Sequence, residues 1–134
     1  MSLPGGSREP EDADLFATAV RETEEEVGVD LARDARYLGR LAPLRARARG
    51  AVLDMDVSPF VFALDREVVP KINAEAEEAF WLPLERAQRG ELDHVHLYLD
   101  QKGASRELPA WRFEERVVWG MTHRILSELF DAVR

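Results

Sequence analysis

The sequence predicts a single domain of mixed helices and strands, of the α/β or α+β class. Two segments carry apolar residues at helical spacing, one near the start and one at the end of the chain, and β-rich stretches lie between them. The length of 134 residues agrees with the commonest domain size of roughly 100–150 residues. No repeat or linker divides the chain, so we expect one domain over residues 1–134.

The first helix is expected over residues 13–27. Asp12 or Asp14 supplies an N-cap, and Gly28 stands where a left-handed residue commonly ends a helix. The last helix is expected over residues 113–133, where apolar residues recur at helical spacing.

The middle of the chain predicts strands, with one short helix. Strands are expected over 35–41, 51–64, 79–83 and 94–99, and a helical turn or two over 84–89. Pro59 indicates an edge position or a bulge in the second strand, because proline has no N–H to donate. An arginine-rich loop is expected between the first two strands.

The composition excludes several classes of protein. The absence of cysteine rules out a disulfide scaffold, a thiolate metal site and a cysteine nucleophile, and leaves the cytoplasm as the default location. The net charge of −8 argues against binding to a nucleic-acid backbone, although a phosphorylated substrate held through a cation remains compatible. No apolar run reaches the ~18 residues that a membrane span requires.

Three glutamates fall on one face of the first expected helix. At about 100° per residue, Glu22, Glu25 and Glu26 lie together and away from the apolar stripe. An isolated run of this kind would be interpreted as a solvated face. Gathered carboxylates also suit Mg²⁺ or Mn²⁺, which would remove their mutual repulsion. Arg21 stands four residues before Glu25 and is placed to brace it.

A longer pattern surrounds these glutamates. It consists of Gly6, Asp12 and the run Arg21-Glu22-Thr23-Glu24-Glu25-Glu26-Val27-Gly28-Val29. The pattern closely resembles the Nudix box, G-x5-E-x7-R-E-U-x-E-E-x-G-U, with Thr23 at an aliphatic position and Asp12 one residue further from Arg21 than the usual glutamate. That insertion and the later Val118-Trp119-Gly120-Met121-Thr122 are similar to the coenzyme A pyrophosphatase branch.

The resemblance implies a Nudix-type α/β/α sandwich with a mixed sheet. It also implies a hydrolase of phosphoric anhydrides that cleaves the pyrophosphate bond of a nucleoside diphosphate linked to another moiety, with coenzyme A-like substrates favoured. Two alternatives remain open. One is a nucleoside triphosphate pyrophosphohydrolase of the same family, and the other is a Nudix-like domain that binds a nucleotide or a protein without turnover.

The resemblance further implies roles for single residues. Glu22, Glu25 and Glu26 are the expected ligands of Mg²⁺ or Mn²⁺, with Arg21 as their orienting residue. The general base is expected to be either Glu26 or a carboxylate of the acidic segment that begins at Glu75. The structural positions of the motif are Gly5, Gly6, Asp12 and Gly28.

Two further expectations concern the substrate and the oligomer. Arg45 and Arg47 are candidates to contact substrate phosphates, with a plain surface loop as the alternative, while Trp81 and Trp119 are expected in the core. The motif and strands that precede Pro4-Gly5-Gly6 in the coenzyme A branch are absent here. Either the chain is shortened at its N-terminus, or its sheet is completed in another way. A sheet edge left open would pair with another chain, so a homodimer is predicted.

Overall fold

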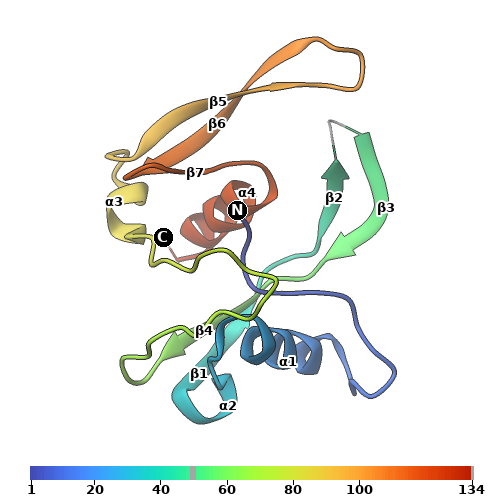
Figure 1. Cartoon of the computed structure of the whole chain (residues 1–134), viewed down its shortest axis with the longest axis vertical. Helices are drawn as coiled ribbons and strands as arrows, with labels where there is room; N and C mark the ends of the chain where they lie inside the picture. Colours follow the sequence, from blue (N-terminus) through green and yellow to red (C-terminus); the bar gives the residue numbers. More distant parts are fainter. Residues whose placement is uncertain (49–50, 134) are drawn as a thin grey trace. The chain divides into compact units, whose positions relative to one another are not determined.

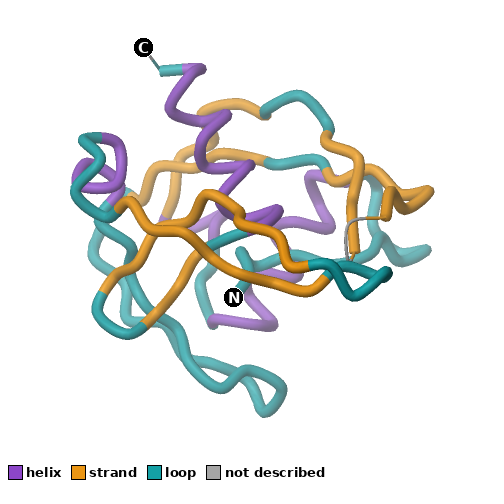
Figure 2. The backbone as a smooth tube through the Cα atoms, turned by 90° about the horizontal axis from the view of Figure 1, so that it is seen from above, coloured by secondary structure: helices purple, strands orange, loops and turns teal. Residues whose placement is uncertain are grey.

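The computed structural model of the chain describes residues 1–48 and 51–133. These residues form two compact units. The α1 unit comprises Leu3–Leu41 and Ser58–Trp81, and the α4 unit comprises Met1–Ser2, Ala42–Val57 and Leu82–Arg134. Figure 1 labels their helices and strands, and Figure 2 separates helices (purple) from strands (orange).

The α1 unit joins two helices to a pair of antiparallel strands. Its elements are α1 (Leu15–Val27), α2 (Leu31–Asp34), β1 (Ala35–Arg40) and β4 (Phe60–Leu64). The Asp14 side chain caps α1 by accepting a hydrogen bond from the Ala17 N–H at 2.8 Å. Gly28 ends the helix with φ of 70°, and its N–H donates to the Glu24 carbonyl at 2.9 Å.

An aromatic cluster holds α1 against the β1–β4 pair. The Phe16 ring of α1 meets the Tyr37 ring edge-on, with centroids 4.9 Å apart, and lies 5.8 Å from Phe60 and 5.6 Å from Phe62. Edge-on pairs of this kind stabilise by about 0.5–1.5 kcal/mol beyond the area they bury. The apolar stripe of α1 therefore determines which face of the helix turns toward the strands and which face keeps its charged residues.

The α4 unit contains the remaining elements. They are β2 (Leu44–Ala48), β3 (Ala51–Val57), α3 (Leu84–Gln88), β5 (Asp93–Leu99), β6 (Ser105–Phe113), β7 (Arg116–Val118) and α4 (Gly120–Ala132). β2 pairs with β3, and the other three strands form an antiparallel sheet in the order β5-β6-β7. Helix α4 packs on β6, where the buried Trp111 ring lies 5.5 Å from Phe130 and 4.2 Å from His123.

The structure confirms the predicted α/β class and much of the element order. The first helix ends as predicted, and β1, α3 and β5 match the expected segments. The long strand expected over 51–64 is divided into β3 and β4 at Ser58–Pro59, where proline cannot continue a ladder of hydrogen bonds. All pairs among the described strands are antiparallel, so the parallel pairing of a mixed sheet is not seen in this part of the chain.

Several predictions were wrong. The expected basic loop contains strand β2, and no strand forms over 79–83. Residues 113–118 are the end of β6, a turn and β7, so that the last helix begins at Gly120. Trp81 is 58% exposed, and the exposed Trp119 ring stacks on His96 at 4.2 Å, so neither tryptophan is a core residue. The segment at 113–118 was misassigned because its two valines fit the helical spacing of the residues that follow.

None of the described helices has the length and apolar character needed to cross a membrane. The single domain over residues 1–134 stays a prediction, because the described residues divide into two compact units.

Candidate functional site

The site is built around one arginine and one buried aspartate. The Asp12 side chain is only 6% exposed and accepts two hydrogen bonds from Arg21, from Nε at 3.0 Å and from Nη2 at 2.9 Å. The Thr18 hydroxyl and the Glu9 N–H each donate to the same carboxylate at 2.9 Å. The Arg21 hydrogen bonds hold the pKa of the Asp12 carboxyl well below its usual range. Both oxygens of the Asp12 carboxylate therefore accept hydrogen bonds from within the protein.

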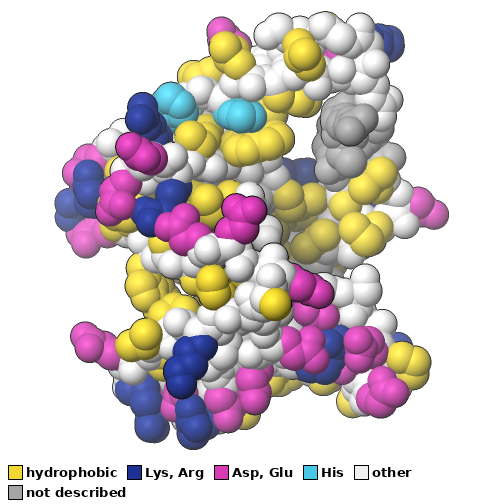
Figure 3. Space-filling model, viewed as in Figure 1, with side chains coloured by type: hydrophobic (Ala, Val, Ile, Leu, Met, Phe, Trp, Pro, Cys, Tyr) yellow, Lys and Arg dark blue, Asp and Glu magenta, His cyan; other side chains and the backbone are white. Residues whose placement is uncertain are grey.

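Arg21 connects this aspartate to the glutamates of α1. Its Nη1 donates to Glu22 Oε1 and to Glu25 Oε2, both at 3.1 Å, and its Nη2 also donates to the Ser7 carbonyl at 3.3 Å. The ion pair between Arg21 and Glu25 has the i,i+4 spacing that the sequence predicts. One guanidinium therefore ties the loop before α1 to two carboxylates on the helix. In Figure 3 acidic side chains (magenta) gather around basic ones (dark blue) at the lower right, where Figure 1 places this loop and α1.

Two glutamates of α1 lie against the paired glycines. Glu26 Oε2 accepts a hydrogen bond from the Gly5 N–H at 3.3 Å. A Cβ added to Gly6 would lie 2.5 Å from the Glu22 carboxylate, so only glycine allows this close approach. Burial raises the pKa of the Glu26 carboxyl, and the neighbouring carboxylates of Glu22 and Glu75 raise this pKa further against the opposing Gly5 N–H. Arg21 pairs with Asp12, Glu22 and Glu25 at once, so its single positive charge compensates the negative charge of the cluster only in part.

The contact at Gly6 leads to a first testable prediction. Gly6→Ala is expected to push the flexible Glu22 side chain aside while leaving the fold intact, because the clash involves only the end of that side chain. Metal-dependent activity should fall roughly 10- to 100-fold, as for residues that position a metal ligand. Gly5→Ala is the matched control, since it keeps the N–H and its new Cβ meets nothing within 4 Å. Equal activities of the two variants, with equal melting temperatures, would contradict the positioning role of Gly6.

The loop after β4 brings a further carboxylate to the same place. The Lys71 N–H donates to the Val27 carbonyl at 2.7 Å, and the Asn73 N–H donates to the Glu26 carbonyl at 3.2 Å. The Asn73 side chain in turn accepts from the Glu75 N–H at 3.1 Å. These bonds hold the loop on the last turn of α1. They explain why the charge of Glu75 contributes to the raised pKa of Glu26.

Gly28 is required by its neighbours as well as by its own conformation. Its positive φ disfavours a side chain, and an added Cβ would lie 3.0 Å from Lys71 Cβ. The glycine that ends α1 therefore also lets the loop approach the helix.

The predicted substrate arginines belong to the other compact unit. Arg45 belongs to the α4 unit and forms ion pairs within its own hairpin, at 3.0 Å to Asp54 and 3.1 Å to Asp56. The backbone of Arg47 lies in β2, but its side chain is outside the described part, as is the whole of Arg49. Contact of Arg45 and Arg47 with substrate phosphates stays a prediction.

Two residues of the site, Thr18 and Asn73, were not predicted from the sequence. Thr18 stands three residues before Arg21 and so shares its helix face, a spacing that pointed to a common partner. Asn73 had no comparable signal, because its role depends on a loop that reaches α1 only after folding.

The donor set fits a divalent cation that is shared with a substrate. Among the described residues, no group of three or more histidine, aspartate or glutamate side chains is spaced to hold a metal ion. Glu22 and Glu26 nevertheless place hard oxygen donors together, and Arg21 donates to Glu22 as well as to Glu25. Mg²⁺ is usually held by one or two carboxylates plus substrate phosphates rather than by a complete protein cage. The pair is therefore suited to such a shared site.

Comparisons with known proteins agree with this arrangement. The family model described as the NUDIX domain matches residues 1–102. A protein of Photorhabdus laumondii described as "uncharacterized Nudix hydrolase NudL" is 33% identical over 100% of this chain and 68% of its own length. Proteins of Yersinia pestis and Yersinia pseudotuberculosis with the same description are 31% identical over 99% of this chain and 64% of their own. The chain thus spans about two thirds of the length of these relatives.

The chain belongs to the Nudix family. Members of this class are hydrolases that act on phosphoric anhydrides, generally with divalent metal ions and on small molecules of the nucleotide type.

Proposed function

We propose that this chain hydrolyses the pyrophosphate bond of a nucleoside diphosphate linked to another moiety, with Mg²⁺ or Mn²⁺. The observation that carries the proposal is the placement of Glu22 and Glu26 beside the Gly5–Gly6 turn, with the charge of Glu75 close by. A cluster of carboxylates that one guanidinium neutralises only in part is costly unless a cation joins it.

Each residue of the cluster has a distinct role in such a reaction. Glu22 and Glu26 would hold the cation, with Glu25 as a further ligand on release from Arg21. A bound divalent cation neutralises charge on phosphate oxygens and lowers the pKa of a bound water. The general base is Glu26 or Glu75, the carboxylates whose charges interact. Arg21, anchored on Asp12, keeps the helix carboxylates oriented.

Within this class we favour coenzyme A-like substrates. The support is the resemblance of the insertion at Asp12 and of the segment 118–122 to the coenzyme A pyrophosphatase branch. No nucleic-acid or membrane partner is part of the proposal, given the net charge of −8. We also propose a cytoplasmic location and a homodimer, and light scattering at high concentration tests the homodimer directly.

A substrate screen tests the proposed function. Coenzyme A, ADP-ribose, NADH, diadenosine polyphosphates and deoxynucleoside triphosphates are incubated with and without Mg²⁺, and the products are separated and identified. We expect Mg²⁺-dependent cleavage between two phosphates, fastest with coenzyme A. Fastest cleavage of a triphosphate would select the triphosphate pyrophosphohydrolase instead. Binding of these compounds without cleavage under any metal would contradict the enzymatic proposal.

A further inference from the structure

Strand β5 forms one edge of the three-stranded sheet in the α4 unit. The strand order β5-β6-β7 leaves the outer side of β5 without a partner among the described strands. Its pairing with β6 runs over seven consecutive residues, Asp93–Leu99, without a register shift. Figure 1 shows the two strands as a long hairpin. An edge of this length and regularity presents a row of backbone N–H and C=O groups to any strand that approaches it.

Two hydrogen bonds at the ends of β5 show which of its residues turn their backbone groups outward. The Asp100 N–H donates to the Ala104 carbonyl at 2.9 Å, and the Arg112 N–H donates to the Leu92 carbonyl at 2.8 Å. The even-numbered positions therefore face β6, because the direction of the backbone groups alternates along an antiparallel strand. The odd-numbered positions of β5 direct their N–H and C=O groups to the open edge.

Three of these outward positions also carry exposed apolar side chains. Val95 is 51% exposed, Leu97 is 61% exposed and Leu99 is 68% exposed. They lie on one face of the sheet, because side chains alternate along a strand, while the Trp119 ring stacks on His96 of the other face. No lysine, proline or carboxylate interrupts the stretch from Val95 to Leu99, although sheet proteins commonly protect an edge with such residues. The edge of β5 is therefore apolar and unprotected.

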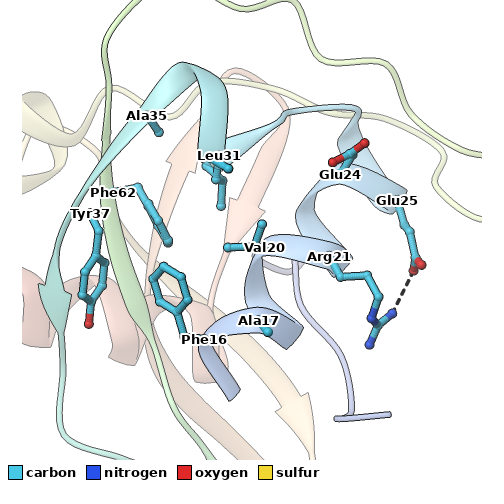
Figure 4. A pocket seen from close by; sticks show the side chains of 11 residues that line it. Phe16, Ala17, Val20, Arg21, Glu24, Glu25, Leu31, Ala35, Tyr37 and Phe62 are labelled. Atoms are coloured by element: carbon cyan, nitrogen blue, oxygen red, sulfur yellow. Dashed lines mark hydrogen bonds and ion pairs between the residues drawn. The ribbon is translucent and has the colours of Figure 1, made fainter. Parts of the chain in front are cut away.

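The other strands of the described part of the chain are less suited to receive a further strand. β7, at the opposite edge of the same sheet, has three residues and begins at the charged Arg116. The β1–β4 pair has a register shift between Tyr37 and Gly39, and the β2–β3 pair has one between Arg45 and Arg47. The cavity of about 890 Å³ on the apolar stripe of α1 (Figure 4) is lined by side chains that include the aromatic ring of Tyr37, so it does not present a strand edge.

The sequence of β5 is complementary to itself in one antiparallel register. With Leu97 on a two-fold axis, the two copies of Leu97 lie opposite each other and can exchange both backbone hydrogen bonds. Val95 then lies opposite Leu99 of the second copy, so that every exposed apolar residue meets another. Moving the axis to His96 would set Asp93 against Leu99, and moving it the other way would set Val95 against a polar residue. The pattern therefore selects the register centred on Leu97.

We propose that β5 is the contact surface of a homodimer, in which two copies of this chain pair their β5 strands antiparallel about Leu97 and join their sheets into one. An open sheet edge requires a strand as its partner, and a second copy supplies one that matches it in backbone direction and in side chains. Such an interface uses the same surface on both subunits, so association ends at two. The inference assigns a surface to the homodimer proposed above. It is independent of the proposed hydrolysis, because the carboxylate cluster belongs to the α1 unit.

A substitution on the axis tests the surface. Leu97→Lys brings like charges directly opposite each other and should keep the chain monomeric. Leu38→Lys is the matched control, because Leu38 is a strand residue of the α1 unit and is 59% exposed. Mass is measured by light scattering over a series of protein concentrations, and melting temperatures verify the fold. The wild type and Leu38→Lys should rise from one chain to two with concentration, whereas Leu97→Lys should stay at one.

A single introduced thiol tests the register, because the chain has no cysteine of its own. Hydrogen-bonded residues opposite each other have Cα atoms about 5.5 Å apart, within the disulfide range of roughly 4.4–6.8 Å. Leu97→Cys should therefore cross-link two copies under mild oxidation. Val95→Cys should not, because its two copies would lie four residues apart along the strands, or about 13 Å.

Three outcomes would overturn the proposal. A wild type that stays monomeric at every concentration would leave the edge to a strand of another protein. A dimer that survives Leu97→Lys would place the contact on a different surface, and equal cross-linking of the two cysteine variants would exclude the register centred on Leu97. Since none of these measurements uses hydrolysis, a failure here leaves the proposed function untouched.

Discussion

Replacement of Glu26 by glutamine is expected to lower the Mg²⁺-dependent hydrolysis rate by about 10²- to 10⁴-fold, as for loss of a metal ligand or general base. Glutamine keeps the shape of the side chain and can still accept the hydrogen bond from the Gly5 N–H. It removes the negative charge that burial and the neighbouring carboxylates already make unfavourable. The fold should therefore be retained or slightly stabilised while the reaction is lost.

The control for Glu26 is Glu67→Gln. Glu67 is an exposed glutamate of the same unit that lies outside the carboxylate cluster. Rates are measured across a range of Mg²⁺ concentrations, together with thermal melting of both variants. If Glu26→Gln turns over substrate at the wild-type rate at saturating Mg²⁺, the assignment of this glutamate to the reaction is wrong.

The largest loss of stability is expected from Asp12→Asn. Asp12 is buried and receives four hydrogen bonds, two of them from the Arg21 guanidinium. Asparagine removes the charge opposite that guanidinium and cannot accept at both terminal atoms, so a buried donor loses its partner. The melting temperature at pH 7 should drop by several degrees. Activity should fall as well, because Arg21 also holds Glu22 and Glu25.

The effect of Asp12→Asn should depend on pH in a defined direction. The Arg21 hydrogen bonds lower the pKa of Asp12 in the folded protein below its ordinary 3.8. A carboxyl with a lowered folded pKa stabilises fully above its unfolded pKa, and this stabilisation is lost as the pH falls toward the folded pKa. The difference in melting temperature between wild type and variant should therefore be constant near neutral pH and shrink below a pH of about 4.

An exposed aspartate provides the comparison for this measurement. Asp65→Asn changes the same chemical group at an exposed position. The backbone N–H of Asp65 donates to the Asp34 carbonyl, and the substitution leaves that bond unchanged. Its melting curve should follow that of the wild type across the pH range. If the difference in melting temperature between wild type and Asp12→Asn stays the same at low pH, the charge of Asp12 is not the source of its stabilising effect.

Features that depend on neighbours in the chain were predictable from the sequence. Asp14 and Gly28 mark the two ends of α1, because capping depends only on residues within one turn of the helix end. The shared face of the three glutamates follows from helical geometry alone. The ion pair between Arg21 and Glu25 is local for the same reason. Residues 116–118 show the limit of such reasoning, because their pairing with β6 outweighs the apolar spacing that they share with α4.

The sequence by itself determined the family, the first helix and the positions of Glu22, Glu25 and Glu26 on it. The tertiary structure decided which carboxylates act together. It sets Glu22 and Glu26 against the glycine turn and brings the loop with Glu75 to the end of α1. It also opens the aromatic cavity around Tyr37. The physical reason is one of distance along the chain: helix spacing and caps are fixed by residues a turn apart, whereas these contacts join segments that only packing brings together.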